Sequence, residues 1–199
     1  MKTIIFDLGG VLIDFDPRYL YRKLFDHEHE VTAFLETICT REWNEQQDAG
    51  RTIAVATAER VQMFPDHRAL IEAYYSRWTE MLGGTILGTV DILRELRQKG
   101  TPLYALTNFS AETFVTARTI YDFLGWFEGI LVSGEEKMIK PDPRIYQLTL
   151  KRFSIDPNTT IFIDDRKENV AAAEKFGIHG IHFSTPGKLR LELAMAGCL

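Results

Sequence analysis

Short apolar runs of strand length alternate with helical patterns along most of this chain. The runs span residues 3–8, 103–107, 129–132, 160–163 and 178–183. Nearly every position in them is apolar, which is typical of parallel strands buried on both faces. Helical periodicity covers residues 90–98, 111–121, 143–153, 167–176 and 187–196. Strand alternating with helix predicts an α/β fold with a doubly wound parallel sheet.

Residues 17–84 interrupt this alternation, because they carry helical periodicity without a convincing strand. We expect them to form a small helical cap domain inserted after the first strand. Residues 1–16 and 85–199 would then form the core. Gating motions need a few compliant positions, so residues 14–17 and 83–84 are the expected hinges.

Composition argues against several classes of partner. The 199 residues carry a formal charge of −5, which gives no reason to expect binding to nucleic acid or an anionic membrane. No apolar run approaches the ~20 residues of a membrane span, and Asp7 comes too early for a signal peptide. Cys39 and Cys198 make neither a disulfide framework nor a zinc cluster. We expect a cytoplasmic protein, monomeric or homodimeric.

Polar side chains follow the apolar runs where the predicted strands end. They are Asp7, the pair Thr107-Asn108, Lys140, and the pair Asp164-Asp165. Ligands of such sheets bind beyond the carboxyl ends of the strands, where the strand order reverses. The sequence therefore predicts three carboxylates, one ammonium, a hydroxyl and an amide at one edge of the sheet.

These groups suit transfer of a phosphoryl group. The Asp7 carboxylate is a competent nucleophile toward phosphorus and would form an acyl phosphate. Both reactants are anions, so a divalent cation must bridge them, and Asp7 and Asp165 offer the oxygen ligands that Mg²⁺ prefers. Thr107 and Asn108 can hold phosphoryl oxygens at a helix N-terminus. Lys140 adds a compact positive charge.

Four segments resemble the motifs of the haloacid dehalogenase-like (HAD) hydrolase superfamily, in the same order along the chain. They are IIFDLGGVL at residues 4–12, LTN at 106–108, KPDP at 140–143 and FIDDR at 162–166. The resemblance implies a HAD-like Rossmannoid core with the small helical cap of one subfamily. It also implies a Mg²⁺-dependent phosphatase that acts on a small phosphorylated metabolite, such as a sugar phosphate.

By the same resemblance, Asp7 is both nucleophile and metal ligand. Gly9 gives its backbone carbonyl to Mg²⁺, and Asp165 is the direct carboxylate ligand. Asp164 and Asn169 lie next to this ligand and would support the metal through water or the loop.

One departure from the family pattern concerns Gly9. Most phosphatases of the superfamily have an aspartate there, which protonates the leaving oxygen and then activates water. The acidic pair resembles that of the phosphatase domain of soluble epoxide hydrolase and of a bacterial glucose-1-phosphate phosphatase, and the latter also lacks this aspartate. Gly9 implies slower chemistry, a better leaving group, or a substitute acid such as Asp14, Asp16 or Asp48.

The expected cap contains further candidates. Residues 43–50 are rich in polar groups and resemble the family's cap segment that faces the active site. We expect Trp43 and Gln46 to bind substrate, with ordinary solvated surface as the alternative. Arg18 would contact the outer part of the substrate, or form a surface ion pair.

Two other activities stay open. A 2-haloacid dehalogenase uses the same nucleophile without a metal and tolerates Gly9, but it has no need of the pair Asp164-Asp165. A catalytically weak family member would bind a phosphorylated ligand without turnover.

Overall fold

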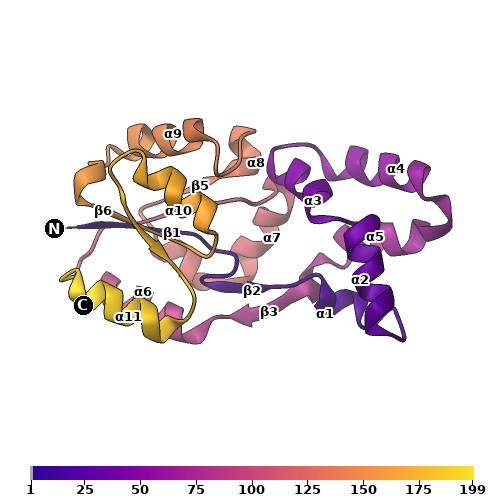
Figure 1. Cartoon of the computed structure of the whole chain (residues 1–199), viewed down its shortest axis with the longest axis horizontal. Helices are drawn as coiled ribbons and strands as arrows, with labels where there is room; N and C mark the ends of the chain where they lie inside the picture. The colour runs from indigo at the N-terminus through magenta and orange to yellow at the C-terminus, as the bar shows by residue number, and fades with distance from the viewer. Residues whose placement is uncertain (1) are drawn as a thin grey trace.

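A parallel sheet forms one half of the molecule (Figure 1). The structure is a computed structural model that describes residues 2–199. The sheet has the strand order β5-β4-β1-β6-β7, with every neighbouring pair parallel. Its strands are β1 (Thr3–Phe6), β4 (Leu103–Thr107), β5 (Gly129–Val132), β6 (Thr160–Asp164) and β7 (His179–His182). The predicted fold class is confirmed.

Helices cover both faces of this sheet. The helices are α6 (Leu87–Gln98), α7 (Ala111–Ile120), α8 (Ser133–Glu136), α9 (Pro143–Phe153), α10 (Lys167–Glu174) and α11 (Pro186–Met195). Ile4 and Phe6 of β1 belong to the apolar cluster that includes residues of α6, α7 and α11, whereas Ile5 belongs to the cluster with α9 and α10. Successive strand residues point to opposite faces, so burial on both faces explains the continuous apolar runs.

The order of the strands places a switch point at β1. After β1 the chain builds β4 and β5 on one side, then returns to build β6 and β7 on the other. Adjacent crossover connections leave this point in opposite directions, which opens a crevice beyond the carboxyl ends of the central strands. The polar residues predicted at strand ends therefore meet at one place.

Residues 18–81, called here the helical insert, lie beside the sheet at the end away from both chain termini (Figure 1). Its helices are α1 (Arg18–Tyr21), α2 (Glu28–Thr37), α3 (Arg41–Asp48), α4 (Ile53–Met63) and α5 (Arg68–Ser76). Short 3-10 helices span Pro65–His67 and Trp78–Met81. Its interior is aromatic, since Tyr21 packs on Phe34 and Trp43 packs on Tyr74. Within residues 2–199, none of the helices has the length and apolarity to cross a bilayer. The division into domains stays a prediction.

A two-stranded antiparallel ribbon joins the insert to the sheet. It pairs β2 (Ile13–Phe15) with β3 (Leu82–Thr85), and Asp14 lies opposite Gly84. The expectation that residues 17–84 contain no strand was wrong for β3, because glycine is a poor strand former and gives no sequence signal. A Cβ atom on Gly83 would lie 2.1 Å from the Asp14 carboxylate, so this pairing requires glycine. The hinge role of these residues stays a prediction.

Substitutions at two glycines test how the local backbone conformation affects the stability of the chain. Gly177, after α10, has φ +84°, and Gly187 in α11 has open space at its Cβ position without a left-handed φ. We expect Gly177→Ala to lower the free energy of unfolding by about 1 kcal/mol, because left-handed backbone disfavours a side chain. Gly187→Ala should raise it by about 0.5 kcal/mol by restricting the unfolded chain. Urea unfolding of both variants measures this, and shifts of the same sign would contradict it.

Candidate active site

Asp7 sits in a tight loop directly after β1. Its carboxylate accepts a hydrogen bond from the Leu8 backbone N–H at 2.7 Å, and the Leu8 carbonyl accepts from Leu12 and Ile13 at 2.8 Å each. Gly10 has φ +71°, and a Cβ atom there would lie 2.4 Å from an Asp165 carboxylate oxygen. The loop can therefore approach Asp165 only because residue 10 is glycine.

Lys140 connects the ends of the three central strands. Its ammonium Nζ lies 3.0 Å from Asp7 Oδ1, 2.7 Å from Asp164 Oδ2 and 2.9 Å from the Leu106 carbonyl. The side chain is 1% exposed, so these charges interact with little screening by water. The structure thus brings Asp7 of β1, Leu106 of β4 and Asp164 of β6 together on one cation.

Asn108 and Thr107 complete the end of β4. Asn108 forms a reciprocal pair with the backbone of Lys140: its Nδ2 donates to the carbonyl at 3.0 Å, and its Oδ1 accepts from the N–H at 2.8 Å. This pair fixes the loop that carries Lys140. The Thr107 hydroxyl is fully buried and has no hydrogen-bond partner among the described residues.

The acidic residues divide into two kinds. Oxygen atoms of Asp7, Asp164 and Asp165 lie within 4.8 Å of one another. Besides Lys140, Asp164 accepts from the Arg166 backbone N–H at 2.8 Å and from Asn169 Nδ2 at 3.0 and 3.1 Å, so its oxygens are occupied. Asp165 is exposed. Three carboxylates against one ammonium form an oxygen-rich, net negative site, and such a donor set fits Mg²⁺.

The environment shifts the pKa values of these groups. Burial raises the pKa of Asp7 to about 7; Lys140 opposes the shift, and Asp164 and Asp165 add to it. Partial desolvation, together with the charge of Asp164, raises the pKa of Asp165. Burial by itself disfavours the charged form of Lys140, yet the two adjacent carboxylates outweigh it and raise its pKa. The raised pKa values of Asp7 and Asp165 reflect burial and crowding of negative charge, which a bound cation would offset.

A cavity of about 850 Å³ extends from this site toward the helical insert. Arg18 lines it and also donates to Glu28 and Thr32, at 2.9 Å each, so the surface ion pair is present and contact with a substrate stays a prediction. Trp43 and Gln46 are not among the residues that line the cavity, so the structure gives their expected contact with substrate no support and it stays a prediction.

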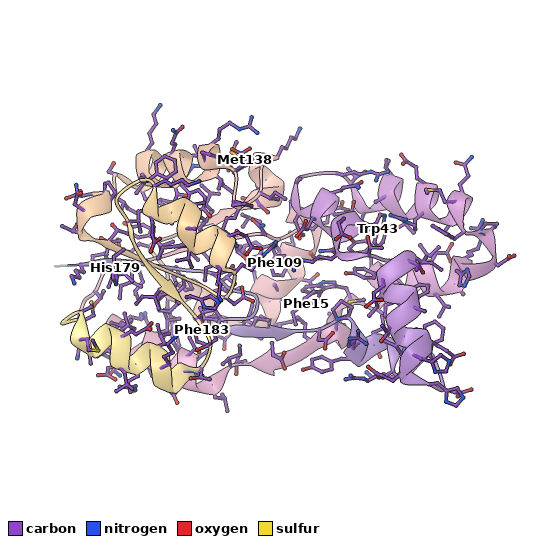
Figure 2. All side chains as sticks on the ribbon, in the orientation of Figure 1. Phe15, Trp43, Phe109, Met138, His179 and Phe183 are labelled. Carbon is purple, nitrogen blue, oxygen red and sulfur yellow. The ribbon has the colours of Figure 1, made fainter. Side chains whose placement is uncertain are left out.

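The reason is the rotation of α3. Trp43 is 2% exposed and packs edge-on against Tyr74, whereas Gln46 is exposed and accepts from Arg51 at 2.6 Å. Figure 2 shows Trp43 inside the helical insert, while Phe15 and Phe109, which line the cavity, lie near its junction with the sheet.

Sequence reasoning missed Asn44 and Glu45, which line the cavity together with Asp48. Glu45 accepts from Arg166 of the core at 2.9 Å and from Arg41 at 3.1 Å. Asn44 and Asp48 are four residues apart and share one face of the helix. Trp43 and Gln47, also four apart, are buried on another face. The four-residue spacing can be recognised in the sequence. Nothing in the sequence shows, however, which of these two helix faces contacts the core.

The chain is similar to known hydrolases along most of its length. The profile of haloacid dehalogenase-like hydrolases matches residues 1–177. The chain belongs to this family. It is 31% identical to a sesquiterpene phosphatase of Aspergillus oryzae over 99% of this chain and 97% of that one. It is 25% identical to a phosphorylated carbohydrates phosphatase of Thermotoga maritima, over 96% and 91%.

A solved structure adds the metal. A HAD family enzyme from Bacteroides thetaiotaomicron, in complex with magnesium and inorganic phosphate, superposes with a TM-score of 0.69 at 25% identity, over 93% of this chain and 95% of that one. The protein is therefore a hydrolase, and several of its relatives are named phosphatases, while a more distant one, of Burkholderia cepacia, is named a 2-haloacid dehalogenase. Magnesium is present in a related structure.

Replacing Lys140 tests the charge arrangement. We expect Lys140→Met to lower the free energy of unfolding by about 3–5 kcal/mol, because two buried carboxylates lose their partner. The folded-state pKa of Asp7, already raised by burial, would then stand further above its unfolded value, so stability falls as pH rises from about 5 to about 8. Lys140→Met with Asp164→Asn should recover most of the loss. Urea unfolding at both pH values measures this; a loss independent of pH would contradict it.

Proposed function

We propose that this hydrolase is a Mg²⁺-dependent phosphomonoesterase that acts on a small phosphorylated metabolite. The observation that carries the proposal is the position of Asp7, which lies between Lys140 and Asp165 at the carboxyl end of β1 and lines the cavity. A buried carboxylate flanked by a cation and a further ligand carboxylate suits attack on phosphorus.

Asp7, Asp165 and the backbone carbonyl of Gly9 would hold the ion. Bound Mg²⁺ supplies the charge neutralisation that lets an anionic carboxylate approach an anionic phosphoryl group. Asp164 and Asn169 act behind these ligands: the amide fixes the carboxylate, and the Arg166 N–H fixes the loop that presents Asp165.

The chain's own groups hold and attack the phosphoryl group. The Lys140 ammonium and the unpartnered Thr107 hydroxyl would contact phosphoryl oxygens, next to the N-terminus of α7. Asn108 keeps Lys140 in place through the reciprocal backbone pair. Asp7 attacks phosphorus and releases the alcohol, and water then cleaves the resulting aspartyl phosphate.

The substrate class follows from the cavity and the relatives. A volume of about 850 Å³ accommodates an organic group as well as a phosphate. One relative is named for phosphorylated carbohydrates, which are polar, and another for a sesquiterpene, which is apolar. We expect a sugar phosphate or another small phosphorylated metabolite. Cytoplasmic location, and a monomer or homodimer, remain our expectations.

Two substitutions separate nucleophile from metal ligand. Asp7→Asn should abolish hydrolysis of p-nitrophenyl phosphate, because the attacking oxygen is lost. Asp165→Asn should weaken Mg²⁺ binding, seen in a titration of activity against Mg²⁺, while the fold stays intact. Asp91→Asn, at an exposed position on α6, is the matched control and should keep full activity. Full activity of Asp7→Asn, or of the wild type in EDTA, would refute the proposal.

A substrate screen decides between phosphate and halide chemistry. Phosphorylated metabolites and 2-haloacids are supplied with Mg²⁺ and, separately, with EDTA, and released phosphate and halide are measured. We expect phosphate release that requires Mg²⁺. Halide release in EDTA would identify a dehalogenase, and binding of phosphorylated compounds without turnover would identify a catalytically inactive member.

A further inference from the structure

The proposed reaction needs a proton donor that the loop after β1 does not supply. Gly9 has no side chain, and a Cβ atom built there meets no described atom within 4 Å beyond its neighbours. Its φ lies outside the left-handed region, so a side chain is compatible with the backbone. The departing alkoxide of an ordinary phosphate ester is a strong base, and breaking its bond to phosphorus is slow without protonation.

Four other carboxylates lie shortly after β1 or along the cavity, and each has a partner of its own. Asp14 accepts from the Tyr19 hydroxyl at 2.8 Å, and Asp16 accepts from the Arg18 backbone N–H at 2.9 Å. Glu45 is held by two arginines. Glu168, on α10, accepts from Arg166 at 2.6 Å. Glu45 and Glu168 are thus paired with arginines, and neither Asp14 nor Asp16 is among the residues that line the cavity.

Asp48 differs in position and environment. It is half-buried, lines the cavity with Asp7 and Asp165, and accepts from Asn44 Nδ2 at 3.1 Å. Its carbonyl accepts from the core residue Ser133 at 2.6 Å. These contacts fix the end of α3 against the core, at the wall of the cavity that Asp7 also lines.

The surroundings of Asp48 favour a carboxyl group that keeps its proton near neutral pH. Burial raises the pKa of Asp48 to about 7, and the charge of Glu45 adds to the shift. The Ser110 backbone N–H opposes it by a hydrogen bond to the carboxylate. Ser110 begins α7, two residues after Asn108, so the carboxyl lies beside the expected phosphoryl pocket.

We propose that Asp48, carried on the helical insert, is the general acid and base that replaces the missing side chain at Gly9. This rests on the proposed phosphatase function. In the first step Asp7 forms a bond to phosphorus, the bond to the leaving oxygen breaks, and the Asp48 proton passes to that oxygen. The products are the free alcohol, an aspartyl phosphate on Asp7 and the Asp48 carboxylate.

The second step returns the proton. The Asp48 carboxylate takes a proton from a water molecule, whose oxygen attacks phosphorus. The bond from phosphorus to the Asp7 oxygen breaks, inorganic phosphate leaves, and Asp48 is again protonated. Each turnover consumes one water and leaves both carboxyl groups as they began.

The test is the dependence of kcat/KM on the leaving group. A series of substituted phenyl phosphates and one alkyl phosphate is measured with Mg²⁺ for wild type and Asp48→Asn. We expect a shallow dependence on leaving-group pKa in the wild type and a steep one in the variant. The alkyl phosphate should lose ~10²-fold or more, and p-nitrophenyl phosphate less than ~10-fold, since only the poor leaving group needs the proton. Loss of the base should also produce a burst of alcohol ahead of phosphate.

Two further variants distinguish chemistry from docking of the insert. Asp48→Asn combined with Gly9→Asp should restore a shallow dependence, because the new carboxyl occupies the open space at residue 9. A defect in packing alone would not be rescued from there. Glu36→Gln changes an exposed carboxyl on α2 of the helical insert that also lines the cavity, and it should keep the wild-type slope.

The outcomes separate this inference from the function beneath it. A wild type without phosphatase activity would overturn both. An active wild type with Asp48→Asn losing the same factor for every leaving group, or losing nothing, would overturn the role of Asp48 alone. A steep slope that Gly9→Asp does not flatten would also overturn it.

Discussion

The contact of one buried ammonium with two carboxylates organises the carboxyl edge of the sheet. Lys140 lies within 3.0 Å of Asp7 and Asp164 and within 2.9 Å of the Leu106 carbonyl, so a single cation joins β1, β6 and β4. Desolvating these charges costs free energy that only close pairing offsets. The arrangement is therefore sensitive to loss of any member, and it keeps Asp7 at a fixed place. Asp165, one residue beyond this pair, remains open to a further cation.

The carboxyl edge was predictable from sequence because parallel strands carry a strong signal. Apolar runs on both sides of β1 fix where the strands end, and the strand order then brings Asp7, Asn108 and Asp164 together without any knowledge of contacts. The different environments of the two adjacent aspartates were not predictable. Asp164 and Asp165 are adjacent and chemically alike, and only the three donors on Asp164 show which of them is exposed.

The helical insert was less predictable, since helix periodicity identifies faces but not their neighbours. Asn44 and Asp48 face the cavity and Trp43 is buried, because the Tyr74 ring packs against the indole. That contact joins residues about thirty positions apart, and no local pattern encodes it. The β2–β3 ribbon has the same origin: Gly83 is accepted in a strand because Asp14 approaches its backbone closely. Tertiary contacts overrode local propensity in both places.

Placing a proton donor on the insert would make the chemistry depend on closure. Glu45 binds Arg166, the residue that follows the proposed ligand Asp165, and the Asp48 carbonyl accepts from Ser133, directly after β5. The same few contacts that seat α3 over the sheet therefore bring Asp48 to the cavity. With the insert displaced, Asp7 would face solvent without an acid beside it, so the aspartyl phosphate would form only when water access is restricted. In the proposed arrangement, glycine two residues after Asp7 would place proton transfer on α3 of the helical insert and no longer on the loop after β1.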